Sequence, residues 1–260
     1  MNIITLTTDY GTDSHYVAQV KGALYKAAGA HVPVIDISNR VAAFDINDAA
    51  FTVKNSYAFF PQGTLHLIGV NNQADSQMRH LAAIAGGHCI IAADNGVLPL
   101  IFEQTEGVTY FDLGDTKDYS AFITRDFYPL VVQKLLETGL DATAAGYSSI
   151  SDPVIRLSEK PIVRDNFLRA TVIFIDSFGN AYLNLSKAYF DEFVGSSKYV
   201  FKILREEFPG VLHNDYSDTE AGEVVFMFKN NNYLQIALNR GRADQYLGLK
   251  KNTNILIEKI

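Results

Sequence analysis

Several things that the sequence lacks narrow the class of protein. The 260 residues include one cysteine, Cys89, so no disulfide can form within the chain, and its strand-like surroundings favour a buried apolar role over that of a nucleophile. No apolar run approaches the roughly 20 residues that cross a bilayer. The amino terminus shows neither the basic region nor the cleavage site of a signal peptide. We therefore expect a cytoplasmic protein with no membrane partner.

Basic residues are also in the minority. The chain has 22 Lys and Arg against 29 Asp and Glu, a net charge of −7, and this balance leaves no basic stripe for a nucleic-acid partner. The six histidines show no ligand spacing and no cysteine pair accompanies them, so we expect no metal. P-loop, G-x-G-x-x-G and G-x-S-x-G motifs are missing as well.

The first half of the chain alternates short β-branched runs with helical patterns. The run IITLTT precedes a helical pattern over residues 14–28, and a second helix is expected to begin at an Asp45 cap. Further strands are predicted at VPVIDI, TLHLIGV, HLAAIA and HCIIAA, and further helices at GVLPLIFEQ and DFYPLVVQKLLETG. Such alternation predicts an α/β domain with a mostly parallel sheet covered on both faces.

The pattern changes near residues 155–165. Beyond that point, short strand-like runs are separated by turn-rich pieces such as SFGN and KNNN. This predicts a smaller all-β domain, a barrel or a sandwich. We therefore divide the chain into an α/β domain at 1–157 and a β domain at 162–260.

Polar residues follow two of the predicted strands. Ligands of an open parallel sheet bind beyond the carboxyl ends of its strands, which is where Asp9 lies. Asp9 is either a cap or turn residue, or a carboxylate that binds a vicinal diol, as acidic residues bind ribose in dinucleotide folds. Asp94 and Asn95 either cap the next helix or line the same site.

Six segments occur in order over nearly the whole chain. They are TTDYG…YVAQVKG, FPQGTLHLIGV, ADNGVL, RDFYP, DSFGNAYLNL and YLQIALNRGRADQYLGL. Together they resemble the S-adenosylmethionine (SAM) hydroxide adenosyltransferase family, the SAM hydrolases related to fluorinases and chlorinases. The resemblance implies an N-terminal α/β domain, a C-terminal β-barrel and a homotrimer. In that trimer SAM lies between the N-terminal domain of one subunit and the C-terminal domain of its neighbour.

The resemblance also assigns roles to residues. Asp9 would hold the ribose hydroxyls, Phe44 would lie beside the adenosyl group, and Phe122 would lie against the reacting carbon. SAM or adenosine is then the ligand, with no separate cofactor. Because SAM has a diol and a cationic sulfonium but no phosphate, a carboxylate suits it better than a glycine-rich loop.

Three binding residues are implied in the second domain. Asn180 of the FGN turn would hydrogen-bond adenine, helped by the backbone around Asn239 and Arg240 of the NRG turn. In the absence of the resemblance, both segments read as ordinary small-polar turns.

The chain departs from the family at its catalytic triad. SAM hydrolases carry an Asp, an Arg and a His in segments like VDPGVGSERRP and FHGRD, which correspond here to VNNQADSQMRH and FITRD. The three positions hold Asn71, Met78 and Ile123, none of which accepts a proton at neutral pH.

Other residues could replace the missing groups. Arg79 stands one place beyond the family arginine, and Asp75 and His80 are the nearest titratable neighbours. Thr124 corresponds in position to a hydroxyl residue of the fluorinases, although the other fluorinase features are not evident. A halide needs only donors such as this hydroxyl, because it arrives already ionised.

Two functional hypotheses remain open. The first is an enzyme that displaces methionine from the 5′ carbon of SAM to give adenosine or a 5′-substituted adenosine, with Asn71, Arg79 and Thr124 as catalytic candidates. The second is a SAM- or adenosine-binding module that has lost turnover. An unrelated α/β enzyme with an appended barrel is a third interpretation.

Overall fold

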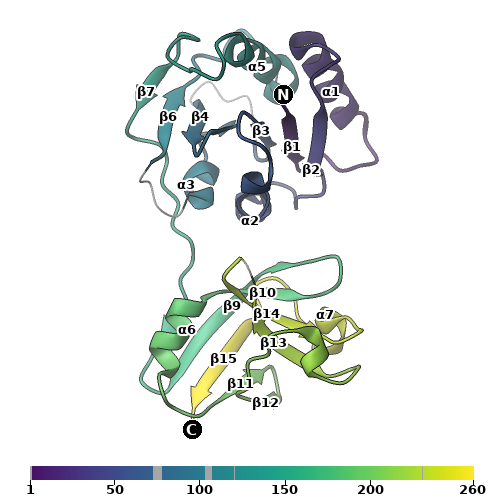
Figure 1. Cartoon of the computed structure of the whole chain (residues 1–260), viewed down its shortest axis with the longest axis vertical. Helices are drawn as coiled ribbons and strands as arrows, with labels where there is room; N and C mark the ends of the chain where they lie inside the picture. Colours follow the sequence, from purple (N-terminus) through teal and green to yellow (C-terminus); the bar gives the residue numbers. More distant parts are fainter. Residues whose placement is uncertain (1, 73–77, 103–106, 120, 230) are drawn as a thin grey trace. The chain divides into compact units, whose positions relative to one another are not determined.

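The computed structural model describes all residues except 1, 73–77, 103–106, 120 and 230 (Figure 1). The chain folds into two compact units, Met1–Leu157 and Ser158–Ile260. Within the described residues, no helix has the length and apolar character needed to cross a membrane.

A seven-stranded sheet forms the centre of the first unit. Its strands are β1 (Ile4–Thr8), β2 (Val34–Ser38), β3 (Leu65–Gly69), β4 (His80–Ala85), β5 (His88–Ala93), β6 (Thr109–Asp112) and β7 (Ser148–Ile150). They lie in the order β2-β1-β3-β5-β4-β6-β7. The first four strands in that order pair in parallel, whereas β4, β6 and β7 join antiparallel.

The prediction of a mostly parallel sheet is therefore wrong, and the sheet is mixed. The reversal begins between β4 and β5, where Ala85 pairs with His88 across the two glycines Gly86 and Gly87. Their φ angles of 56° and 81° suit the tight turns that join antiparallel strands. The Gly-Gly pair between two apolar runs was thus a hairpin signal in the sequence.

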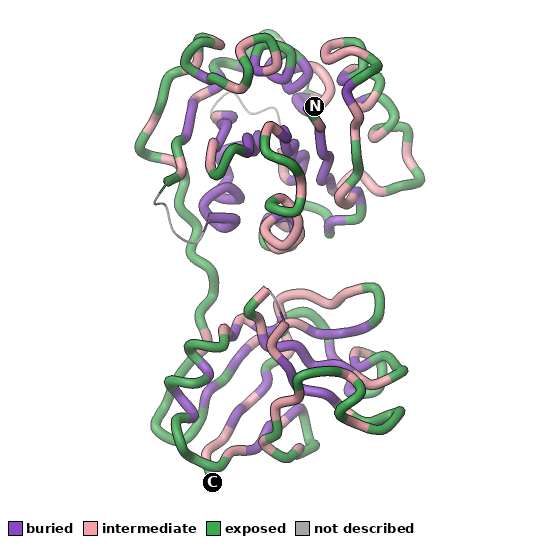
Figure 2. The backbone as a smooth tube through the Cα atoms, viewed as in Figure 1, coloured by how far each residue is buried: buried purple, intermediate pink, exposed green. Residues whose placement is uncertain are grey.

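Helices cover both faces of this sheet. They are α1 (His15–Ala28), α2 (Ile46–Lys54), η1 (Tyr57–Phe59), α3 (Val97–Ile101), α4 (Ile123–Asp126) and α5 (Tyr128–Glu137). Core residues of α1 and α5 pack in one cluster with Leu65 and Leu67, whereas those of α2 and α3 pack with Ile68 in another. Alternate residues of β3 thus face opposite layers, and the central strands are buried on both sides (Figure 2).

The predicted cap of α2 is confirmed. Oδ1 of Asp45 accepts hydrogen bonds from the backbone N–H groups of Asn47 and Asp48, both at 3.1 Å. Cys89 is also buried as expected, and its burial raises the pKa of the thiol to about 12.

The second unit is built on an antiparallel sheet. Its strands are β8 (Ile162–Val163), β9 (Phe167–Ile175), β10 (Ala181–Ser186), β11 (Tyr199–Ile203), β12 (Glu206–Pro209), β13 (Val224–Phe228), β14 (Tyr233–Leu238) and β15 (Asn254–Lys259). The main path runs β12-β11-β15-β9-β10-β14-β13, with β8 beside β9. Three short helical segments complete the unit, α6 (Lys187–Val194), η2 (Tyr216–Asp218) and α7 (Ala243–Tyr246).

The prediction of an all-β barrel needs correction. Among the described strands the path begins at β12 and ends at β13 without pairing these two, so the sheet is curled but open. The register of β10 shifts against both of its neighbours, and such irregularities bend a sheet. Helix α6 adds Phe190 and Phe193 to the core, a contribution that the strand-like runs did not indicate.

Candidate active site

Polar residues converge at one edge of the first sheet, where β1 and β3 end. Asp9 and Tyr10 follow β1, and Asn71 and Asn72 follow β3. Because the two strands pair in parallel, their carboxyl ends meet at the same edge.

The Asp9 carboxylate anchors two loops. Its Oδ2 accepts hydrogen bonds from the backbone N–H of Phe44 at 2.9 Å and of Asn71 at 3.4 Å. Both donors have positive φ angles, 63° and 46°, which side chains other than glycine rarely adopt. Such backbone conformations persist where the surroundings enforce them and cluster at functional sites. Within the described part of the chain, no group donates to Oδ1 of Asp9, which leaves this oxygen free for a ligand.

A second cluster joins Tyr10, Asn72 and Thr124. The Tyr10 hydroxyl lies 2.7 Å from Oγ1 of Thr124, and the Asn72 amide donates to the same oxygen at 2.8 Å. Thr124 is completely buried. The cluster lies over Gly69, where a Cβ would stand 2.8 Å from the Tyr10 hydroxyl and 2.9 Å from Oγ1 of Thr124. Gly69 thus permits the close approach.

Tyr10 is not a base in this cluster. Burial raises the pKa of its phenol well above the usual value, the hydrogen bond with Thr124 lowers it in part, and the Asp9 charge raises it again. The hydroxyl therefore keeps its proton at neutral pH. Asn72 contributes a buried Oδ1 for which no hydrogen-bond partner is found in the described residues.

Aromatic rings flank the same edge. Phe122 meets Tyr10 and Tyr16 edge-on, with ring centroids 5.3 and 5.6 Å apart, and the Arg125 guanidinium lies 5.0 Å from its centroid. These contacts fix the ring of Phe122. Phe44, by contrast, is 63% exposed, so its side chain is available to a ligand or partner.

The triad positions carry no base. Ile123 is fully buried in the core cluster that includes α1 and α5, and Asn71 uses its backbone N–H for Asp9 and its carbonyl for the Asn95 amide. Met78 is half-buried and cannot titrate. Asp75 lies outside the described residues.

Arg79 is engaged elsewhere. Its Nε donates to Oδ2 of the buried Asp94 at 3.0 Å, and its Nη2 donates to the carbonyl of Asp152 at 2.7 Å. Oδ1 of Asp94 accepts the backbone N–H of Val154 at 2.7 Å. Arg79 therefore ties residues 152–154 to the end of β5. A catalytic role for Arg79 stays a prediction, and its contacts with Asp94 and Asp152 favour a structural role instead.

His80 is enclosed in the core. It is fully buried, and burial lowers the pKa of its imidazole to about 4, although the charge of Asp112 raises it in part. A neutral, enclosed imidazole has no route to a ligand at the sheet edge. The side chain of Asn95 accepts a hydrogen bond from the backbone N–H of Val97 and donates to the carbonyls of Val70 and Asn71, so it connects the start of α3 to the loop after β3; the N-cap residue of α3 is Gly96.

In the second unit, the two predicted turns lie near one another. The carbonyl of Gly179 accepts the backbone N–H of Asp244 at 2.9 Å, and that of Ser177 accepts Nη1 of Arg242 at 2.8 Å. The FGN turn therefore contacts the segment that follows NRG. Asn180 is buried and bonded to Asp176.

The NRG turn is held through Asn239. Its side-chain amide donates to the carbonyl of Thr219 at 2.8 Å, and the exposed Arg240 has a φ of 57°. The roles of Asn180, Asn239 and Arg240 toward a ligand stay predictions.

The structure thus brings five of the predicted residues of the first unit to one edge: Asp9, Phe44, Asn71, Phe122 and Thr124. It adds Tyr10 and Asn72, which the sequence reasoning missed. Tyr10 follows Asp9 and Asn72 follows Asn71 in the sequence. Their place just after a strand would have indicated that they lie at the same edge of the sheet.

Two surface hollows lie away from the predicted site residues. The hollows, of about 530 Å³ each, lie on the second unit around Leu204, and neither includes a predicted site residue. Over the described ranges, no group of three or more His, Cys, Asp or Glu could hold a metal ion.

Comparison with known proteins gives consistent matches. Residues 4–145 match the family model for the SAM hydroxide adenosyltransferase N-terminal domain, and residues 170–256 match that for its C-terminal domain. The chain is 27% identical over 255 residues to a (R)-S-adenosyl-L-methionine hydrolase of Salinispora tropica, covering 95% of this chain and 94% of that protein. It is 22% identical to a fluorinase of Actinoplanes sp., covering 99% and 97%.

A solved structure shares the fold. An uncharacterised conserved protein from Thermotoga maritima superposes with a TM-score of 0.83 at 24% identity, over 99% of each chain.

Proposed function

Because the chain belongs to the SAM hydroxide adenosyltransferase family, we propose that it binds SAM and displaces methionine from the 5′ carbon to give adenosine or a 5′-substituted adenosine. The observation that carries the proposal is the Asp9 carboxylate. It lies at the carboxyl ends of β1 and β3, with one oxygen fixed by two backbone N–H groups and the other without a donor among the described residues. A carboxylate in this position suits the two hydroxyls of a ribose.

The reaction is a single in-line displacement. The bond between C5′ and the sulfonium sulfur breaks, its electron pair stays on sulfur, and methionine leaves as a neutral thioether. With water as nucleophile a bond from C5′ to oxygen forms and one proton is released. With a halide no proton is released. Since the leaving group needs no acid, the protein mainly aligns the reactants and excludes bulk water.

The residues of this chain supply donors and shape in that scheme. The ring of Phe122 packs against that of Tyr10, whose hydroxyl contacts the hydroxyl of Thr124. Of the two bonded hydroxyls of Thr124 and Tyr10, one donates to the other and the second is left to donate to a nucleophile, while Oδ1 of Asn72, without a partner among the described residues, accepts a hydrogen bond. Activation by a general base is not part of the proposal, because Asn71, Met78 and Ile123 cannot act as one.

A second candidate function is a SAM- or adenosine-binding module without turnover. The burial of Ile123 in the core favours it, because the position of the family histidine has become part of the hydrophobic packing. Both candidates require ligand binding and differ only in chemistry.

One assay separates them. Purified protein is incubated with SAM, and adenosine and methionine are quantified by chromatography, while calorimetry measures SAM and adenosine binding. Release of both products in equal amounts supports the enzyme. Binding without release supports the module. Absence of binding by SAM and adenosine would contradict both.

We further propose a homotrimer of cytoplasmic location in which Asn180, Asn239 and Arg240 of a neighbouring subunit complete the site around Asp9. This proposal rests on the family resemblance, and oligomers of this kind are commonly symmetric.

A further inference from the structure

The side-chain amide of Asn180 is held in one orientation by Asp176. Its Nδ2 donates to Oδ2 of Asp176 at 2.9 Å, and its backbone N–H donates to Oδ1 of the same carboxylate, also at 2.9 Å. No donor to Oδ1 of Asn180 is found in the described residues, and this oxygen is absent from the buried unpartnered atoms. Asn180 therefore presents an acceptor to whatever lies against the turn.

The opposite orientation of the amide is disfavoured by charge. A half-turn about the last side-chain bond would place Oδ1 of Asn180 against the negatively charged Oδ2 of Asp176. The charge-assisted hydrogen bond would be lost and a repulsive contact formed in its place. The remaining oxygen of Asp176 cannot adapt, because it already accepts the backbone N–H groups of Phe178 and Asn180.

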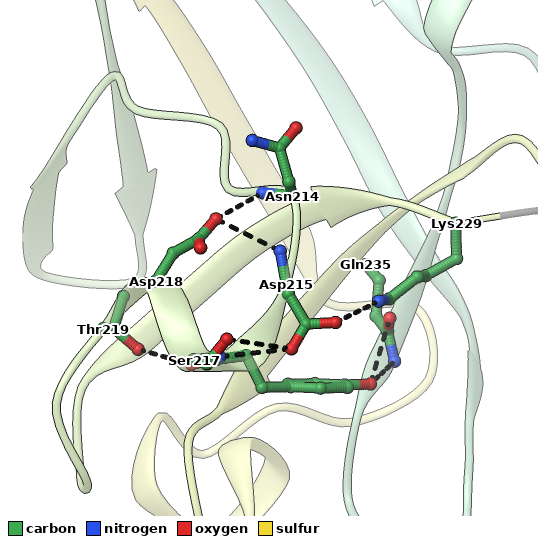
Figure 3. A network of polar contacts seen from close by, with 8 residues as sticks. Asn214, Asp215, Ser217, Asp218, Thr219, Lys229 and Gln235 are labelled. Carbon is green, nitrogen blue, oxygen red and sulfur yellow. Dashed lines mark hydrogen bonds and ion pairs between the residues drawn. The ribbon is translucent and has the colours of Figure 1, made fainter.

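A polar chain leads from Asp176 into the sheet. The Tyr182 hydroxyl donates to Oδ2 of Asp176 at 3.2 Å and accepts from Nε2 of Gln235, which is 1% exposed and also donates to the Tyr216 hydroxyl. Tyr216 follows Asp215 in the loop of Figure 3, where the Asp215 carboxylate accepts hydrogen bonds from the backbone N–H of Ser217 and from Lys229. The orientation of Asn180 itself depends on Asp176, which the backbone N–H groups of Phe178 and Asn180 hold independently of this chain.

We propose that Asp176 is a positioning residue that locks the Asn180 amide with its oxygen toward the ligand, so that the site selects a purine carrying an exocyclic amine over its 6-oxo counterpart. The inference rests on the proposed function, in which Asn180 contacts the base. An amino group at C6 donates to this oxygen, whereas a carbonyl at C6 would face it with a second acceptor. Unmatched polar groups are the strongest means by which sites reject analogues.

The test compares adenosine with inosine, which differ in this group. We expect the wild-type protein to bind adenosine at least about tenfold more tightly, as one well-placed hydrogen bond provides. In Asp176→Asn the carbonyl oxygen keeps the two backbone N–H groups and the new amide faces Asn180. The Asn180 amide then turns to accept from it and presents a donor. The preference for adenosine should fall about tenfold or reverse, with inosine affinity maintained or improved.

Tyr182→Phe is the matched control. It removes one hydrogen bond from the same carboxylate oxygen but leaves the bond to Asn180, so the adenosine-to-inosine ratio should stay at the wild-type value. Thermal unfolding of each variant verifies that it folds. If folded Asp176→Asn keeps the wild-type ratio, or loses affinity for both nucleosides equally, the inference is overturned while the proposed function stands. If the wild type binds neither adenosine nor SAM, the proposed function fails first.

Discussion

At the scale of single residues, the Asp9 carboxylate both holds the structure and offers a ligand contact. Asp9→Ala removes the acceptor for the backbone N–H groups of Phe44 and Asn71, so we expect a loss of about 1–3 kcal/mol in the free energy of unfolding. Affinity for adenosine or SAM should fall at least about tenfold. Calorimetry and thermal unfolding measure the two effects on the same samples.

Two further variants separate these effects. Asp9→Asn keeps an oxygen that can accept both N–H groups but loses the charge, so we expect most of the stability to be retained and the affinity still to fall. Asp13→Ala, at an exposed position, should change neither. Unchanged affinity in a folded Asp9→Ala protein would exclude Asp9 from the site.

Gly69 offers a second test at this scale. An added methyl would meet the Tyr10 hydroxyl and Oγ1 of Thr124 at 2.8 and 2.9 Å, so Gly69→Ala should cost about 1–3 kcal/mol of unfolding free energy by overpacking. Gly22→Ala in helix α1 is the control, because no atom outside the backbone of its own helix and its chain neighbours lies within 4 Å of the new methyl, and there alanine should add about 0.5–1 kcal/mol. Urea unfolding gives both values. Equal stability of Gly69→Ala and wild type would show that the cluster repacks without cost.

At the scale of elements, the ion pair of Arg79 and Asp94 joins the start of β4 to residues that follow β5. The Asp94 side chain is 3% exposed and the Arg79 side chain 34%. Asp94→Asn should therefore lower the unfolding free energy by up to about 3 kcal/mol, with partial solvation of Arg79 limiting the cost. Asp152→Asn removes only an exposed partner of the same guanidinium and should have little effect.

If Arg79 instead acts in catalysis, the outcome differs. Arg79→Lys would then abolish product formation while leaving the melting temperature close to that of the wild type. We expect the reverse, a lower melting temperature with SAM binding maintained in the folded fraction, because lysine cannot form the same forked contacts.

Element boundaries were largely readable from the sequence, whereas strand direction was not. The helix from Asp45 and the strand β3 follow from a capping residue and from a run of apolar residues. The alternation of strands and helices predicts a mostly parallel sheet, whereas the direction of β4 depends on the turn at Gly86 and Gly87. The open edges of the second sheet depend on long-range pairing, which no local pattern specifies.

The candidate site was predictable for residues that follow strands and not for contacts between loops. Asp9 could be selected from its position, but its hydrogen bonds to Phe44 and Asn71 require left-handed backbone at both, which nothing in those residue types indicates. The same applies to Tyr10 and Thr124, which are distant in sequence and meet only through the packing of α4 against β3.

At the scale of the whole molecule, buried histidines make the protein sensitive to acid. Burial, with a smaller contribution from His88, lowers the pKa of His66 to about 3, and burial lowers that of His80 to about 4, both from 6.5. The unfolded chain therefore binds more protons than the folded one between these values. The unfolding free energy should be constant above about pH 6.5 and fall below it by about 1.4 kcal/mol per pH unit for each histidine.

Urea unfolding at pH 7, 6 and 5 measures this slope. His66→Asn should reduce it by about one proton per molecule, while His15→Gln, at an exposed position, should leave it unchanged. If the unfolding free energy were the same at pH 7, 6 and 5, the imidazoles of His66 and His80 would be hydrated in the folded protein.

The proposed trimer can be tested by mass and by complementation. Light scattering at micromolar concentration should give three times the mass of the chain, 28.8 kDa. A monomer that still binds adenosine would contradict the assembly.

Complementation tests whether two subunits share a site. Asp9→Ala and Asn180→Ala should each bind adenosine weakly, because each lacks one half of every site. After subunit exchange in an equal mixture, about a quarter of the sites would combine an intact Asp9 from one subunit with an intact Asn180 from the next. Calorimetry should then find wild-type affinity at that stoichiometry. If Asp9 and Asn180 of the same chain formed the site, mixing would restore nothing, since every chain in the mixture carries one defect. A trimer without restoration would therefore keep the assembly and remove the sharing, whereas restoration requires both.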